Sequence, residues 1–211
     1  IEFLCNLKTH FKSDPQFYVV GGAVRDAIRN IIEGVEYEPD DVDIIVDNED
    51  LESALKAMGI NVEKTFFGGF KIKLENSLRV DIWKAEKTIR TVPAKNVSPL
   101  ENYFNDLYLN LDQIAFNPGT LALFDRGCID GVRNKTMEIQ LCGEGYELTP
   151  VDLSRTISLK RRLGYEFGQN LKEAVKSKRE EVLWHILEKA KKYDYPDDKR
   201  NELVAIVQNL K

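Results

Sequence analysis

The chain has 211 residues, 43% of them hydrophobic and 31% charged, which suits one globular domain or a catalytic domain with a small helical appendage. Its apolar runs fall short of the roughly 20 residues that a membrane span needs, and its N-terminal segment is too interrupted by charge for a secretory signal. Three widely spaced cysteines and only two histidines argue against a zinc site and favour reduced thiols. We therefore expect a cytoplasmic protein with no membrane partner.

Charge is distributed unevenly along the chain. From residue 151 onward there are 14 Lys and Arg against 10 Asp and Glu, whereas residues 1–150 hold 16 against 25. The net charges are +4 and −9, which give the total of −5. An acidic part joined to a basic part suits an enzyme that binds metal at one end and a polyanion at the other, although solvated helix faces have a similar composition.

The first two-thirds of the sequence predicts alternating strands and helices. Residues 17–20 form a short apolar run that ends in two glycines, and residues 24–32 carry a helical apolar stripe. Residues 42–46 are a β-branched run, and residues 51–58 predict a second helix. Strand candidates follow at 62–65, 70–74, 78–83, 114–116 and 121–124, with turns expected at Gly68-Gly69 and Glu75-Asn76.

The character of the sequence changes after Gly145. Thr149 is a good N-cap, Pro150 suits the first helical position, and Asp152 is an acid in the first turn. No convincing strand follows, and an apolar helical stripe comes after Pro196. The sequence therefore predicts an α+β fold, in which a small mixed sheet with flanking helices (residues 1–147) precedes a short all-helical domain (residues 148–211).

The first motif that carries chemistry is GGAVRD at residues 21–26, between a predicted strand and a predicted helix. Glycines at such a turn let backbone N–H groups approach phosphate oxygens, and the helix N-terminus adds a favourable partial charge. The motif alone is weak evidence, because Gly-Gly turns are common for steric reasons.

The second motif is DVDIIV at residues 41–46. Alternation along a strand places Asp41 and Asp43 on one face, about 7 Å apart at the backbone, while the intervening apolar residues face the other way. Two such carboxylates repel each other unless a cation lies between them, and Mg²⁺ favours one or two carboxylates together with phosphate oxygens. A solvent-exposed strand end with incidental acids is the alternative.

The third motif is RVDIW at residues 79–83, where Asp81 lies between Val80 and Ile82. A lone carboxylate on a central strand is costly to bury unless it is paired or binds metal. If this strand lies beside residues 42–46, Asp81 completes a set of three carboxylates that can hold two metal ions for an in-line phosphoryl displacement.

A Gly-Gly turn, an Asp-x-Asp strand and a later lone acid, in this order, resemble the polymerase β nucleotidyltransferase superfamily. GGAVRD followed by DVDIIV resembles the head domain of class II tRNA nucleotidyltransferases and bacterial poly(A) polymerases. The resemblance covers about residues 15–165. Later segments also fit, namely IAFN at 114–117, IDG at 129–131, Arg155, and LGY at 163–165 at the start of a neck domain.

The resemblance implies a role for each of these residues. Gly21 and Gly22 would contact a nucleoside triphosphate, with Arg25 and Asp26 shaping the turn and assisting phosphate binding. Asp41, Asp43 and Asp81 would be catalytic and would bind Mg²⁺.

Arg155, at the start of the neck, and Arg162 are candidates for binding the nucleotide. The basic run Lys160, Arg161 and Arg162 is a candidate for holding a nucleotide or an RNA phosphate. A solvated helix face is an equally good interpretation of this run.

Two family features are absent from the sequence. The Arg-Arg-Asp stretch that helps to distinguish ribose has no arginine in its counterpart here, DLYLNLDQ at 106–113. The Glu-Asp-x-x-Arg template with which a CCA-adding enzyme reads C and A aligns with Thr149 and Asp152, which cannot supply the same donors and acceptors.

These observations favour an Mg²⁺-dependent enzyme that transfers a nucleotidyl group from a nucleoside triphosphate to an unidentified hydroxyl acceptor, and that does not add CCA. Asp81 or solvent would take the proton from the acceptor hydroxyl. One alternative is an RNA or tRNA 3′-end nucleotidyltransferase with a remodelled base pocket. Another is a nucleotide-binding regulatory module without turnover, which the three acids argue against. The sequence indicates no particular oligomeric state.

Overall fold

A computed structural model describes residues 2–47, 50–65, 68–74, 78–85, 97–140, 143 and 146–210. The chain divides into two compact units. Unit 1 comprises residues 1–132 and 141–146, and unit 2 comprises residues 133–140 and 147–211. The expected turn at Glu75-Asn76 and Cys142 lie outside the described residues; Cys5 and Cys128 are free thiols.

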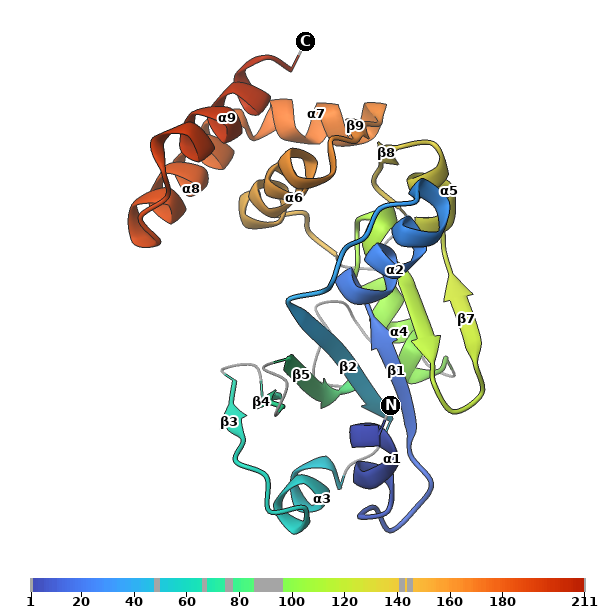
Figure 1. Ribbon diagram of the computed structural model, residues 1–211. Coiled ribbons are helices and arrows are strands. Elements are labelled where there is room, and N and C mark those ends of the chain that lie inside the picture. Colours follow the sequence, from blue (N-terminus) through green and yellow to red (C-terminus); the bar gives the residue numbers. More distant parts are fainter. Residues whose placement is uncertain are drawn as a thin grey trace. The chain divides into compact units, whose positions relative to one another are not determined.

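The described residues of unit 1 form a mixed sheet of seven strands (Figure 1). The strand order is β3-β4-β5-β2-β1-β6-β7. All neighbours pair antiparallel except β2 and β5, which pair in parallel. The strands are β1 (Gln16–Val20), β2 (Asp41–Asp47), β3 (Glu63–Lys64), β4 (Phe70–Lys73), β5 (Arg79–Lys84), β6 (Ile114–Asn117) and β7 (Ala122–Asp125).

Helices flank this sheet, as the α+β prediction required. They are α1 (Glu2–Lys8), α2 (Gly22–Glu33), α3 (Leu51–Ala57), α4 (Pro99–Asn105), the 3₁₀ turn η2 (Asn110–Asp112) and α5 (Cys128–Arg133). The sequence predicted the strands and the helices α2 and α3 to within two residues at most ends. It did not predict α1, α4 or α5 as elements.

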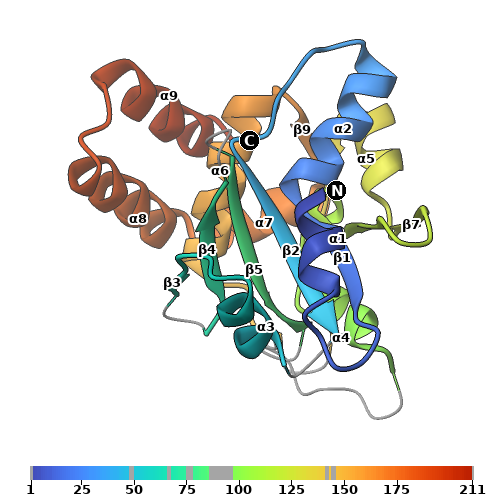
Figure 2. The same cartoon turned by 60° about the horizontal axis from the view of Figure 1, so that its bottom comes forward.

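Alternation along β2 divides the core of unit 1 into two parts. Ile44 and Val46 point into a cluster with α1 and α3, the two helices that lie in front of the sheet in Figure 2. Ile45 points to the other face, into a cluster with Leu100 and Phe104 of α4. Because Asp43 is an even number of residues from Ile45, its carboxylate belongs to the α4 face.

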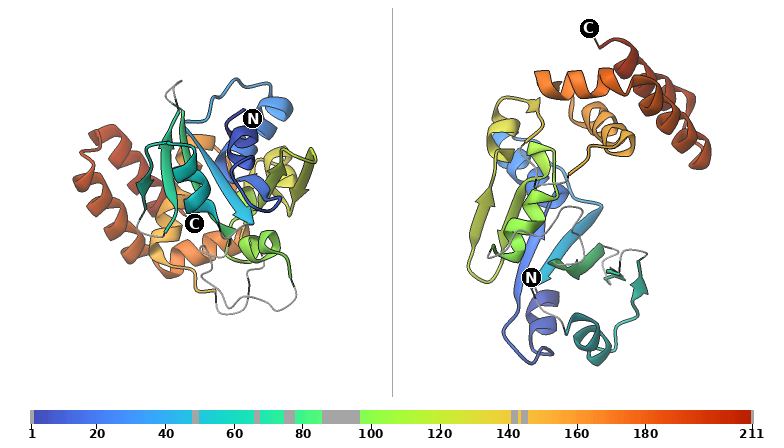
Figure 3. Two further views of the ribbon diagram at one scale, coloured as in Figure 1. Left: turned by 90° about the horizontal axis from the view of Figure 1, so that it is seen from below. Right: turned by 180° about the vertical axis from the view of Figure 1, so that it is seen from behind.

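The helices described in unit 2 are α6 (Pro150–Leu163), α7 (Gln169–Ser177), α8 (Arg179–Lys192) and α9 (Asp197–Gln208) (Figure 3). They pack on one another through apolar side chains that include Leu153, Val182 and Leu203. The prediction of a helical region is confirmed, but the expectation of no strand was wrong. Residues Glu166–Phe167 form β9, which pairs in parallel with β8 (Thr136–Met137). Two residues are too few for periodicity to reveal a strand.

The predicted start of α6 is confirmed in detail. The Thr149 hydroxyl accepts a hydrogen bond from the Asp152 amide at 3.3 Å. In return, an Asp152 carboxylate oxygen accepts from the Thr149 amide at 3.2 Å and from its hydroxyl at 2.7 Å. This capping box satisfies orphan donors of the first turn and buries Asp152, which is 2% exposed.

Candidate active site

The parallel pairing of β2 and β5 brings two of the predicted carboxylates side by side. Asp43 is the direct register partner of Asp81, and Asp41 that of Arg79. Partners in adjacent strands point to the same face of a sheet. The condition set by the sequence, that the Asp81 strand lies beside the Asp-x-Asp strand, is therefore met.

Burial and mutual repulsion perturb the central carboxylate most. Burial is the largest cause that raises the pKa of Asp43 to about 7, and the negative charges of Asp41, Asp81 and Asp112 add to it. The pKa of Asp81 is also raised, mainly by burial, with Lys71 opposing the shift. Removing water from a carboxylate and placing like charges nearby both disfavour its ionised form. The ionised carboxylates of the site are therefore not fully stabilised by the surrounding protein groups.

Within the described ranges, no three His, Cys, Asp or Glu side chains form a ready-made metal-ligand cluster. Two of the acids instead lie near cations: Arg79 is 4.0 Å from Asp41, and Lys71 is 3.9 Å from Asp81. The donor set nevertheless fits Mg²⁺, because it consists of oxygen ligands. A cation placed among these acids would also relieve the repulsion that raises the pKa of Asp43.

The backbone requires glycine at position 21. Gly21 has φ +62° and ψ −128°, a region that side chains rarely adopt. Its amide donates to the Ile114 carbonyl at 3.3 Å, which ties the turn to β6. A Cβ atom on Gly21 would lie 3.9 Å from an Asp43 carboxylate oxygen, so the glycine turn and the acid are neighbours.

Arg25 occupies a buried ion network. It is 3% exposed, and its guanidinium donates to Asp26 at 3.2 Å and to Asp112 at 2.8 Å. Asp26 is likewise buried, at 2% exposure. The network links the first turn of α2 to η2.

The structure places two further residues at the site that the sequence did not indicate. Asp112 bonds Arg25 and contributes negative charge around Asp43. The Tyr103 hydroxyl lies 3.9 Å from the same Cβ position on Gly21. Both residues come from α4 and η2, about 60 to 70 positions after Asp43. A single sequence offers no signal for them beyond the family segment at 106–113.

Arg155 and Arg162 belong to unit 2, and both are exposed on α6. Arg155 contributes positive charge at Lys189 of α8, whose pKa is lowered first by burial and then by Arg155 and Lys199. Their neighbours Lys160 and Arg161 are engaged within unit 2. Lys160 donates to the Tyr165 carbonyl at 2.7 Å, and Arg161 forms an ion pair with Glu202.

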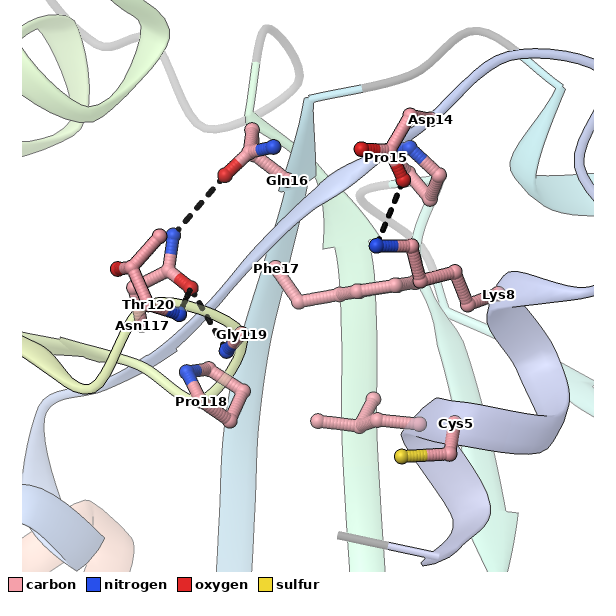
Figure 4. A pocket seen from close by; sticks show the side chains of 11 residues that line it. Cys5, Lys8, Asp14, Pro15, Gln16, Phe17, Asn117, Pro118, Gly119 and Thr120 are labelled. Atoms are coloured by element: carbon pink, nitrogen blue, oxygen red, sulfur yellow. Dashed lines mark hydrogen bonds and ion pairs between the residues drawn. The ribbon is translucent and has the colours of Figure 1, made fainter.

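A pocket of about 230 Å³ lies at the other end of β1 from Gly21, and none of the site acids lines it (Figure 4). An ion pair of 2.6 Å between Lys8 and Asp14 spans one side. The Asn117 amide donates to the Gln16 side chain at 3.1 Å on the other. The pocket is therefore separate from the carboxylates.

The raised pKa of Asp43 predicts a pH dependence of stability. In the unfolded chain Asp43 ionises near pH 4, but in the folded chain it keeps its proton to about pH 7. The folded state thus binds more protons between these values, so the free energy of unfolding should fall as pH rises from about 4 to 7. Urea unfolding in EDTA should show this decrease in the free energy of unfolding with rising pH, and the decrease should be smaller in Asp43→Asn. Equal pH profiles for the two proteins would contradict the shift.

In the part of the chain that the structure describes, no helix is long and apolar enough to cross a membrane. No family model matches the chain, and no curated protein is significantly similar to it in sequence. Solved structures, by contrast, do match.

A CCA-adding enzyme in its apo form I has a TM-score of 0.68 and 17% identity, over 99% of this chain and 50% of that one. A tRNA-processing enzyme, also in an apo form I, has a TM-score of 0.66 and 19% identity, over 100% of this chain and 56% of that one. A tRNA nucleotidyltransferase complexed with a primer tRNA and an incoming ATP analogue has a TM-score of 0.60 and 20% identity, over 93% of this chain and 57% of that one. The chain thus spans little more than half the length of these proteins. It shares the fold of these CCA-adding and tRNA-processing enzymes over nearly its whole length.

Proposed function

We propose that the chain is the catalytic part of a metal-dependent nucleotidyltransferase, which transfers a nucleotidyl group from a nucleoside triphosphate to a hydroxyl acceptor. One observation carries the proposal. Asp43 and Asp81 are register partners on two adjacent strands, and Asp43 lies next to the glycine turn that begins α2. The fold supports it, since solved structures of the same fold hold ATP or CTP.

In the proposed mechanism, the amides in the first turn of α2, from Gly22 onward, hold phosphate oxygens, while the Gly21 amide donates to the Ile114 carbonyl. Asp41, Asp43 and Asp81 hold Mg²⁺, which when bound would stabilise phosphate charge and lower the pKa of the acceptor hydroxyl. The acceptor oxygen bonds to the α-phosphorus as the bond from that phosphorus to the β-phosphate bridging oxygen breaks. Pyrophosphate leaves with the electron pair, and the acceptor proton passes to Asp81 or to solvent.

The Arg25 network has a supporting role in this proposal. By binding Asp26 and Asp112, Arg25 holds the first turn of α2 against η2. Because the guanidinium already has two carboxylate partners, we assign phosphate binding to the backbone amides and assign Arg25 to the shape of the turn. Arg155 and Arg162 remain candidates for contacts with the nucleotide.

An RNA or tRNA 3′ end is the second candidate acceptor. Arg155, Lys189 and Lys199 come from three helices of unit 2 and are close enough for their charges to interact. Clustered cations favour phosphate backbones. A related solved enzyme is complexed with a primer tRNA. A regulatory module without turnover is less consistent with Asp43, because a buried, repelled carboxylate is costly when it has no ion to bind.

A labelling experiment tests the proposed function. The protein is incubated with each α-labelled nucleoside triphosphate, Mg²⁺ and either total RNA or a protein and metabolite extract, and product size is measured. We expect Mg²⁺-dependent label in one product class, and thermal stabilisation by Mg²⁺ only when a triphosphate is present. No labelled product with any triphosphate, or stabilisation by Zn²⁺ alone, would contradict the proposal.

A further inference from the structure

Helix α4 delivers a tyrosine to the face of the sheet that carries Asp43. Ser98 caps the N-terminus of the helix: its hydroxyl accepts from the Glu101 amide at 3.2 Å, and Pro99 follows in the first turn. The buried side chains of α4 pack on Val20, Ile45 and Ala115 of the sheet. Tyr103 is one of them and is 7% exposed. Its ring is therefore fixed by packing, which leaves the hydroxyl little freedom.

The hydroxyl and the central acid surround the same small space. A Cβ atom on Gly21 would lie 3.9 Å from the Tyr103 hydroxyl oxygen and 3.9 Å from Oδ2 of Asp43. Gly21 has no side chain, so the phenol oxygen and the carboxylate both lie beside the space that a side chain would fill. A tyrosine that served only to fill the core would not need its polar atom at this position.

The surroundings of this hydroxyl are acidic. The pKa of Tyr103 is raised well above its usual value, first by burial and then by the charges of Asp43, Asp112 and Asp106. A tyrosine phenol is protonated at neutral pH. A protonated hydroxyl among carboxylates acts as a hydrogen-bond donor, and such charge-assisted bonds are among the stronger ones in proteins.

We infer that Tyr103 is a positioning residue for Asp43. When a metal ion is bound, its hydroxyl, which lies beside Asp43 in this structure, would donate to the Asp43 carboxylate and keep that carboxylate turned toward Asp81, in the orientation that binds metal. The inference rests on the proposed function, because it assumes that Asp43 is a metal ligand. Partners of metal-binding carboxylates fix their orientation in this way. Arg25 restrains Asp112 in a comparable manner on the neighbouring segment.

Tyr103→Phe removes the hydroxyl and retains the ring, and Tyr18→Phe is its matched control. Tyr18 is a partly buried member of the same cluster, and its hydroxyl bonds Asn117, which is not a site residue. Mn²⁺ binding is measured by electron paramagnetic resonance, because Mn²⁺ accepts the same oxygen ligands as Mg²⁺. We expect about 10- to 100-fold weaker Mn²⁺ binding in Tyr103→Phe, unchanged binding in Tyr18→Phe, and the circular dichroism spectrum of wild type in both.

Asp43→Asn distinguishes a failure of the Tyr103 positioning role from a failure of the proposed metal site. If Asp43→Asn loses Mn²⁺ binding while Tyr103→Phe binds like wild type, the positioning role is wrong and the metal site stands. If Asp43→Asn also binds like wild type, the metal site itself is wrong. In the double variant the two losses should not add, because they act on one ligand.

A measurement on the unaltered protein covers the case in which Tyr103→Phe does not fold. With tyrosines labelled by ¹³C at the ring carbon that bears oxygen, Mg²⁺ plus a non-hydrolysable triphosphate should shift the Tyr103 resonance more than that of Tyr18. A Tyr103 resonance that does not move would overturn the inference.

Discussion

We expect Asp43→Ala to abolish Mg²⁺-dependent nucleotidyl transfer and to leave the metal-free protein at least as stable as wild type near neutral pH. Losing the metal ligand removes several kcal/mol of transition-state charge stabilisation, which corresponds to a rate lower by about 10³-fold or more. Stability should not fall, because the variant removes a carboxylate whose ionised form is disfavoured by burial and three neighbouring acids. Initial rates of labelled transfer and urea unfolding measure the two effects.

Asp47→Asn is the control, since Asp47 ends the same strand and is exposed. It should keep the wild-type rate. Asp41→Ala should lose activity as Asp43→Ala does, and the double variant should be little worse than either, because residues that form one metal site act as a unit. A correctly folded Asp43→Ala protein with nearly full activity would defeat the site assignment.

The second large effect that we expect is a missing activity: the protein will not rebuild CCA on tRNA that lacks its 3′ end. A CCA-adding site selects C and then A with side-chain hydrogen bonds, which can discriminate by about 10⁴- to 10⁵-fold. At the aligned position, the Asp152 carboxylate is buried and accepts from the Thr149 amide and hydroxyl. It has no donor to offer a base, because an ionised carboxylate only accepts.

Labelled CTP and ATP, a tRNA without its 3′ end and sequencing of the product measure this expectation. The same preparation must transfer label to some other acceptor, so that inactivity on tRNA is informative. Ordered addition of C, C and A would contradict the prediction. In that case Arg155 or Arg162, which are exposed on α6, would have taken over base recognition, and replacing each of them would test this.

Local patterns predicted the parts of the fold that depend on neighbouring residues. The β-branched run before Asp47 became β2, and the Thr149–Asp152 pattern became a capping box. These features are set within a few residues by strand alternation and by side-chain capping. Helix α4 was not predicted because Pro99 suggests a loop in the sequence, whereas in the structure it occupies the first turn of the helix.

The site could be predicted only in part, for a related reason. Each of Gly21, Asp43 and Asp81 lies in a local motif, and the family resemblance ordered them. Their register is a property of the β2–β5 pairing, which no local pattern specifies. Tyr103 and Asp112 reach the site through packing of α4 and η2, and a tyrosine on a short helix looks like an ordinary core residue in sequence.

The division of β2 between two faces has a consequence for how such chains can vary in length. Ile44 and Val46 are buried against α1 and α3 on one face of the sheet, and this packing determines that Asp43 points to the other face. One residue added or lost in the segment 34–40 before β2 can be absorbed there, since that segment forms no helix or strand. One residue inserted between Asp43 and Ile44 would turn the acid toward the apolar core. Natural variants should therefore differ in length before the acidic strand and almost never within it.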